Sequence, residues 1–159
     1  AEASPPEVLL VEHSYRSKGA WGLPGGALDS IDGDPARPGS DASPDDAIEE
    51  ALRREVCEEL GIEIEVLRLL RVDAVPYIAE EPGPYRLDFY YRCNPATGFD
   101  RLRAGLLSGD IKARSAEIEQ IRLVPLTELG QYDLFSPDIR FLRDDLPRLE
   151  SALLESKDD

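Results

Sequence analysis

The stretch that decides the fold is Arg54-Glu55-Val56-Cys57-Glu58-Glu59-Leu60-Gly61-Ile62, which follows Trp21-Gly22-Leu23-Pro24-Gly25-Gly26 along the chain. Its three glutamates stand at positions i, i+3 and i+4, so on a helix they lie on one face. Like charges at that spacing destabilise a helix by about a few tenths of a kcal/mol. Because hard divalent cations such as Mg²⁺ bind carboxylate oxygens, we expect this cluster to hold a cation.

The acidic stretch belongs to a predicted helix that begins at Ser43 and ends near Leu60. Ser43 suits the N-cap, Pro44 suits the first helical position, and Gly61 suits the residue that stops a helix. Four apolar residues recur every fourth position and predict a buried stripe: Ile48, Leu52, Val56 and Leu60. The glutamates flank this stripe, so we expect them at the edge of the core. Arg54 and Glu58 are also i, i+4 partners.

The rest of the chain alternates between strand and helix patterns. Strands are predicted at 7–13, 21–26, 62–75, 86–93 and 119–124, a turn at 79–85, and a helical turn at 126–129. Residues 94–115 are expected to be irregular or a short helix. Ser136 begins a C-terminal helical region that Pro147 interrupts or restarts. These elements predict a single α/β domain over residues 1–159, in which helices pack against a mixed sheet.

Composition limits the class of protein. The chain has 159 residues, 42% hydrophobic and 32% charged, so one globular domain with a real core is expected. Its net charge of −15 argues against a nucleic-acid duplex or an anionic membrane as the main partner. The same charge would repel a polyphosphate substrate unless metal ions screened it. The segment 29–43, rich in Asp, Gly, Pro and Ser, is predicted to be an acidic surface loop.

Cysteine usage and hydropathy restrict the setting of the protein. Cys57 and Cys93 form no zinc-binding spacing and no disulfide framework. No run of about 18 apolar residues is present, and no signal peptide is visible. We therefore expect a cytoplasmic protein without a membrane partner.

Together, the two opening segments resemble the Nudix hydrolase family. Its signature is Gly, five residues, Glu, seven residues, then Arg-Glu-aliphatic-x-Glu-Glu-x-Gly-aliphatic, and the part from Arg54 to Ile62 matches it throughout. The strand and turn 21–26 and the stretch 122–129 also resemble the family. Two features depart from the pattern: 27 residues separate Gly26 from Arg54, 14 more than the family spacing of 13, and Asp46 replaces the upstream Glu. The resemblance implies the Nudix α/β/α sandwich, with a loop insertion at about 29–43.

The resemblance also implies a reaction. Such proteins hydrolyse a nucleoside diphosphate linked to another group X, with Mg²⁺ or Mn²⁺ as the cofactor; ADP-ribose, dinucleoside polyphosphates, NDP-sugars and NTPs are substrates of this kind. The implied metal ligands are Gly26, through its carbonyl oxygen, and Glu55, Glu58 and Glu59. The implied catalytic residues are Glu58, Arg54 and Glu119. The partner is then a nucleotide-type small molecule, and a homodimer stays open because dimers are common in the family.

Several alternatives stay open at this point. Glu117 is a second candidate for the carboxylate outside the helix, and Glu80 and Glu81 could supply a base from a loop. A non-catalytic Nudix-fold domain that senses nucleotides or mediates an interaction would share the fold. Isopentenyl-diphosphate-isomerase-like chemistry on this fold would need a catalytic cysteine in a separate motif, and neither cysteine here is convincingly placed for it.

Overall fold

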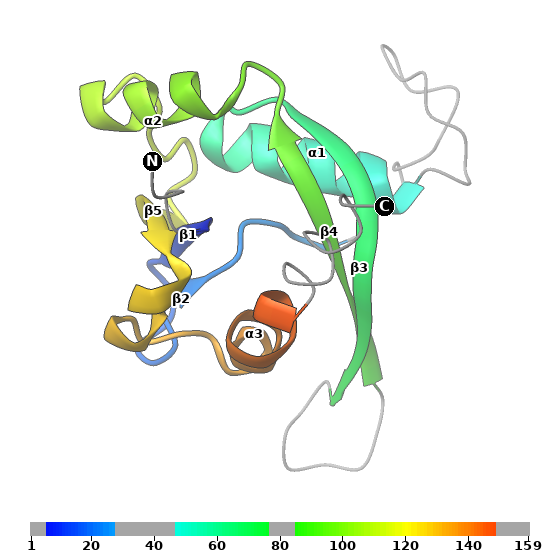
Figure 1. Cartoon of the computed structure of the whole chain (residues 1–159). Helices are drawn as coiled ribbons and strands as arrows, with labels where there is room; N and C mark the ends of the chain where they lie inside the picture. The colour runs from blue at the N-terminus through cyan, green and yellow to red at the C-terminus, as the bar shows by residue number, and fades with distance from the viewer. Residues whose placement is uncertain (1–5, 28–46, 77–84, 149–159) are drawn as a thin grey trace.

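The computed structural model of the chain describes residues 6–27, 47–76 and 85–148 (Figure 1). Its elements are the strands β1 (Glu7–His13) and β2 (Trp21–Gly22), helix α1 (Ala47–Leu60), strands β3 (Ile64–Pro76) and β4 (Tyr85–Pro95), helix α2 (Phe99–Ser108), strand β5 (Ile118–Pro125), the 3-10 helix η2 (Leu126–Gln131), helix α3 (Ser136–Arg140) and the π-helical turn η3 (Phe141–Asp145). Helix α2 lies where the sequence predicted either irregular structure or a short helix. The predicted loop at 29–43 and residues 79–84 of the predicted turn lie outside the described residues.

Strand β1 is the centre of a three-stranded sheet and pairs with β2 on one side and β5 on the other. Successive side chains of a strand point to opposite faces, and both Leu10 and Val11 are fully buried. Leu10 belongs to a core cluster with Phe141 of η3. Val11 belongs to a second cluster with Val56 and Leu60 of α1. Helix α1 therefore covers one face of this sheet and the α3–η3 segment covers the other, which confirms the predicted α/β/α layering.

The strand pairing is more antiparallel than the sequence suggested. Strands β1, β2 and β5 pair antiparallel, and so do β3 and β4 in a second sheet. Within the residues that the structure describes, parallel pairing is confined to one bridge between Trp21 and Leu134. Two backbone hydrogen bonds make it, from Trp21 N–H to the Asp133 carbonyl at 3.1 Å and from Phe135 N–H to the Trp21 carbonyl at 2.7 Å.

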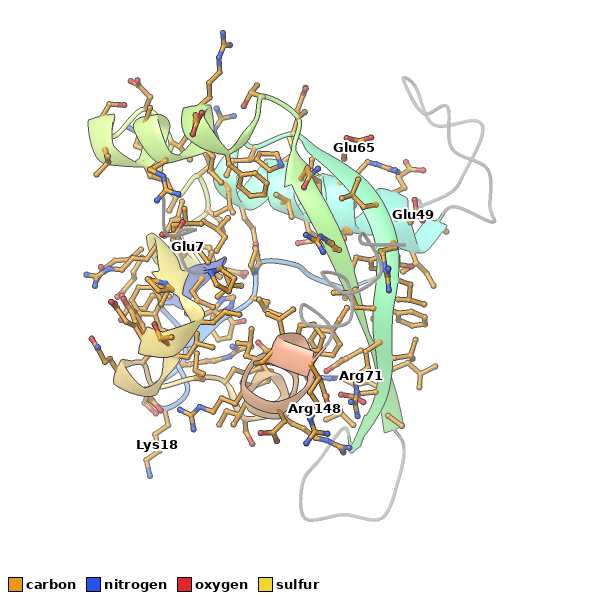
Figure 2. The ribbon with its side chains drawn as sticks, viewed as in Figure 1. Glu7, Lys18, Glu49, Glu65, Arg71 and Arg148 are labelled. Carbon is orange, nitrogen blue, oxygen red and sulfur yellow. The ribbon has the colours of Figure 1, made fainter. Side chains whose placement is uncertain are left out.

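The long β3–β4 hairpin stands beside the first sheet in Figure 1, with α1 behind its upper part and α3 between its lower part and β2. Arg71 of β3, labelled in Figure 2, joins the hairpin to the C-terminal segment by an ion pair with Asp145, and it also pairs with Asp73 of its own strand. The ring of Tyr90 on β4 stacks on Phe141 with centroids 4.2 Å apart. The contacts with Asp145 and Phe141 hold the hairpin against the C-terminal segment formed by α3 and η3.

Helix α1 follows its predicted pattern most closely near its C-terminal end. Val56 and Leu60 are buried, and Leu52 packs partly against the same cluster. Ile48 is only half-buried, so the predicted stripe weakens toward the start of the helix. Gly61 has φ +66°, the left-handed conformation that favours glycine after a helix, and confirms the predicted stop. The predicted N-cap, Ser43, lies outside the described residues.

The C-terminal helical region differs from its prediction in one respect. Pro147 does not interrupt the helical region that begins at Ser136, because residues 146–148 are still helical. The π-helical turn η3 lies immediately before instead, with the Leu146 N–H bonded to the Phe141 carbonyl five residues back. Proline lacks the N–H that an α-helical ladder needs, so a wider turn beside it accommodates the missing bond.

Candidate metal centre

The two halves of the family motif lie against each other despite the long separation between them. Arg54 Nη2 donates a hydrogen bond of 3.2 Å to the carbonyl of Ala27, the residue after the Gly25-Gly26 turn. A Cβ atom at Gly26 would overlap the Glu55 carboxylate, so only glycine fits this position without moving the glutamate. The Gly25 N–H donates to the Glu59 carboxylate. The turn therefore touches three residues of α1, and the longer connection does not separate it from the helix.

Arg54 is held between two of the helix carboxylates. Its Nη1 lies 2.7 Å from Glu55 Oε1 and 3.3 Å from Glu58 Oε2. The side chain of Arg54 is 10% exposed and that of Glu58 is 61% exposed, so one arginine links an inner and an outer carboxylate. Such a group restricts the rotamers of both glutamates, and its bond to Ala27 also restrains the turn.

Glu59 is the buried member of the glutamate trio, with 7% of its surface exposed. The pKa of its carboxyl group is raised to about 7, first by burial and next by the negative charge of Glu55, while the Gly25 N–H opposes the shift. Its Oε2 atom is buried and has no hydrogen-bond partner within the described part of the chain. A buried carboxylate oxygen without a partner, surrounded by other carboxylates, is the arrangement that a bound cation would stabilise.

The structure distinguishes the two candidate carboxylates near β5. Glu117 lies close enough to Glu59 for its charge to raise the pKa of that group. Its carbonyl accepts a 2.9 Å hydrogen bond from Ser14 N–H, which fixes the backbone just before β5. Both glutamates are exposed, but Glu119 falls at the irregularity of the β1–β5 ladder and is not among the groups that shift the pKa of Glu59. Glu80 and Glu81 lie outside the described residues.

The donor atoms suit a hard cation, but the side chains are not arranged as a finished cage. Within residues 6–27, 47–76 and 85–148, no group of three or more His, Cys, Asp or Glu side chains is already placed to hold a metal ion. Glu55 and Glu58 face Arg54 instead. The unpartnered Glu59 oxygen and the close approach of Gly26 to Glu55 nevertheless fit Mg²⁺ or Mn²⁺, which take oxygen ligands.

Comparison with known protein families identifies the domain. The family model described as NUDIX domain matches residues 2–145. The chain belongs to the Nudix family. The match extends over both the turn and the helix described above, and it confirms the family predicted from the sequence. No curated protein matches this Nudix chain.

Solved structures with a similar fold include two that are described as NUDIX proteins. A MutT NUDIX hydrolase from Burkholderia pseudomallei superposes with a TM-score of 0.56 at 23% identity, covering 88% of each chain. The NUDIX domain of Shewanella oneidensis NrtR, in complex with ADP ribose, gives a TM-score of 0.56 at 17% identity, covering 93% of this chain and 80% of that one. The E. coli ORF135 protein gives 0.55 at 21% identity, covering 95% and 86%. At these identities the likeness shows the shared fold.

Reasoning from the sequence predicted the glutamates and the arginine as site residues, but it did not predict two features of their surroundings. It did not predict that the Gly25 N–H binds Glu59, since that bond depends on how the turn docks. It also ranked Glu119 above Glu117, which stays a prediction, and no sequence signal marks the irregularity of the β1–β5 ladder at Glu119. In the described part of the chain, no helix is long and apolar enough to span a membrane.

Proposed function

We propose that this protein is a Mg²⁺- or Mn²⁺-dependent hydrolase that cleaves the diphosphate of a nucleoside diphosphate linked to another group. The observation that carries the proposal is Glu59: its carboxylate is buried beside other carboxylates, and its Oε2 has no hydrogen-bond partner among the described residues. A site that concentrates negative charge in this way opposes folding on its own, so a cation is the group that would offset it. Family membership supports divalent-metal chemistry in general.

The proposed ligands are Glu55, Glu58, Glu59 and the carbonyl oxygen of Gly26. The metal, when bound, neutralises phosphate charge and lowers the pKa of water. Arg54 holds Glu55 and Glu58 in place through its ion pairs and ties Ala27 to the helix.

Proton transfer needs a carboxylate near the attacking water. Glu58 is the proposed base from the helix because its side chain is largely exposed and can reach a substrate. Glu119 stays the carboxylate predicted from the sequence for the role outside the helix. The position of Glu117 beside Glu59 supports it as the competing candidate for that role.

A nucleotide-type substrate is proposed for the same site. The NrtR NUDIX domain, which shares the fold, was solved with ADP ribose, and this supports ADP-ribose as the first compound to test. The net charge of −15 makes metal screening of any phosphate substrate essential. The cytoplasmic location and the homodimer stay predictions.

A substrate panel tests the proposal. Purified protein is incubated with Mg²⁺ or Mn²⁺ and ADP-ribose, dinucleoside polyphosphates, NDP-sugars, NADH, or normal and oxidised NTPs, and nucleoside monophosphate or phosphate release is measured. Turnover of at least one compound, abolished by a chelator and by Glu58→Gln and Glu59→Gln, is the expected result. The proposal fails if no compound is cleaved or if both variants keep full activity.

A non-catalytic nucleotide-binding domain is the second candidate. The ion pairs that Arg54 makes with Glu55 and Glu58 favour it, because they occupy carboxylates that a metal would need. Calorimetry that detects tight nucleotide binding, with no turnover of the same compound, would establish this alternative. Isomerase chemistry is disfavoured by Cys93, since burial raises the pKa of its thiol to about 11 and keeps it protonated at neutral pH.

A further inference from the structure

The parallel bridge between β2 and residues 133–135 ends on a side chain rather than on the backbone. After Phe135 N–H bonds to the Trp21 carbonyl, the next donor on this side of the chain is the N–H of Leu23, the residue just after β2. The backbone acceptor nearest in sequence, the Phe135 carbonyl, already accepts the Asp138 N–H at 2.9 Å. Leu23 N–H donates instead to Asp138 Oδ2 at 3.1 Å. The Asp138 carboxylate thus replaces a backbone carbonyl at the end of this ladder.

The surroundings hold the Asp138 carboxylate in one orientation. Its second oxygen, Oδ1, accepts a 3.2 Å hydrogen bond from the Tyr90 hydroxyl, and the residue is 9% exposed. Gly22 leaves room for it, because a Cβ there would lie 2.9 Å from Oδ2. The guanidinium of Arg16 also acts on Asp138 electrostatically and lies 3.7 Å from the Phe135 ring. A buried charge with both oxygens bonded is well suited to fix the position of a backbone N–H.

The segment that Leu23 begins is the turn that carries the candidate metal centre. Two residues later, Gly25 N–H donates to Glu59, and Gly26 packs on Glu55. The turn is therefore held from two opposite sides, by α1 at Gly25 and Gly26 and by α3 at Leu23. Loss of either anchor would let the turn move relative to the glutamates.

We propose that Asp138 is a positioning residue for the metal centre, which sets the distance between the Gly25-Gly26 turn and the glutamates of α1 by holding Leu23. It touches neither the metal nor the substrate. The proposal rests on the proposed function, since it assigns Asp138 a role in the same site. It goes beyond that function because no residue of α3 belongs to the family motif.

Asp133 supplies a matched control on the other side of β2. Its Oδ2 accepts the Gly19 N–H at 2.7 Å, so it anchors the loop that precedes β2 with the same type of bond. Replacing Asp133 loosens the chain before β2, whereas replacing Asp138 loosens the turn after it. A general loss of rigidity would affect both variants alike, and a positioning role would affect only Asp138.

The experiment measures Mn²⁺ binding to the whole metal-free chain by electron paramagnetic resonance titration, together with the amide signals of Gly25 and Gly26 in ¹⁵N spectra. Asp138→Ala is expected to weaken Mn²⁺ binding by about 10-fold or more and to move both glycine signals. Asp138→Asn should restore both properties, because its carbonyl can still accept from Leu23. Asp133→Ala should leave both unchanged. With a substrate from the panel, Asp138→Ala should lower kcat more than it raises KM.

Two results would overturn the proposal: unchanged Mn²⁺ affinity and glycine signals in Asp138→Ala, or equal weakening in Asp133→Ala. If Asp138→Ala does not fold, Gly22→Ala replaces it, because the added methyl group displaces the carboxylate from Leu23 without removing its charge. An unchanged Mn²⁺ affinity in Gly22→Ala would then overturn the proposal. If the unmodified protein binds no Mn²⁺, the proposed function fails, and the glycine signals still decide whether Asp138 positions the turn.

Discussion

Two buried carboxylates hold the same turn, and they differ in how their oxygens are bonded. Asp138 is 9% exposed and Glu59 is 7% exposed. Asp138 has a partner on each oxygen, Leu23 N–H and Tyr90 O–H, whereas Glu59 accepts from Gly25 N–H and leaves Oε2 without a partner in the described part of the chain. Equal burial with unequal bonding separates a carboxylate that completes the fold from one that is suited to bind a ligand.

The neighbouring charges differ in the same sense. Burial raises the pKa of both groups, and Asp88 also raises that of Asp138, but Leu23 N–H, Tyr90 and Arg16 stabilise Asp138 as an anion. Glu59 faces further carboxylates, with Glu55 contributing most. A bound cation would therefore stabilise the ionised carboxylate of Glu59 and would have little effect on that of Asp138. The predictions below test this contrast.

The largest expected effect is on catalysis. Glu59→Gln removes a charged ligand and should lower kcat by at least about 100-fold with any substrate that the panel identifies. Asp138→Asn should lower it far less, since the amide can still accept from Leu23 N–H. Initial rates at saturating Mg²⁺ check this prediction, with circular dichroism to show that both variants fold. Equal losses in the two variants would remove the distinction between the two carboxylates.

The second effect is on stability and concerns Asp138. Asp138→Ala leaves the buried Tyr90 hydroxyl with its weaker bond to the Pro137 carbonyl and leaves Leu23 N–H without an acceptor. The free energy of unfolding should fall by about 2–3 kcal/mol, because unmet buried donors are costly. Urea denaturation of the metal-free protein measures it. A loss below the error of the method would contradict a structural role for this carboxylate.

The third effect is the pH dependence of stability that Glu59 causes. Its pKa in the folded protein is about 7, above the ordinary value of 4.5, so the native state keeps a proton that the unfolded chain has lost between these values. Stability from this group therefore falls as pH rises from about 4.5 to 7. The free energy of unfolding of Glu59→Gln should exceed that of the unmodified metal-free protein by on the order of 1–3 kcal/mol at pH 8. The two values should match near pH 4.5. Urea denaturation at both pH values measures the difference.

Because His13 also titrates, the test compares the free energy of unfolding of Glu59→Gln with that of the unmodified protein at each pH. Burial lowers its pKa from 6.5 to about 4, so its contribution to stability is lost as pH falls through that range, the opposite direction to Glu59. Both proteins contain His13, and its effect cancels when their stabilities are subtracted. Saturating Mn²⁺ should reverse the order at pH 8 because only the glutamate gains a charged partner. A difference that does not change with pH would contradict the raised pKa.

Much of this contrast could not be read from the sequence. The i, i+3, i+4 spacing predicted a shared face for the three glutamates. The apolar residues at every fourth position predicted that this face lies at the edge of the core. Glu58 and Glu59 are adjacent, however, and their very different exposure depends on where the Gly25-Gly26 turn docks. Asp138 was recognisable only as part of a helix start. Its partner Leu23 lies 115 residues away, and local patterns carry no information about such a contact.

The smallest effect comes from making the two carboxylates more alike. Tyr90→Phe removes the hydroxyl group that donates to Asp138 Oδ1. That oxygen then loses its hydrogen-bond donor and resembles Glu59 Oε2. The ring still stacks on Phe141, so the expected cost is about 1 kcal/mol, the net value of one hydrogen bond. Mn²⁺ stoichiometry should not rise, because Arg16 supplies positive charge near Asp138. A second bound Mn²⁺ in this variant would show that one missing hydrogen bond suffices to create a site, and that the carboxylates around Glu59 are not what distinguishes it.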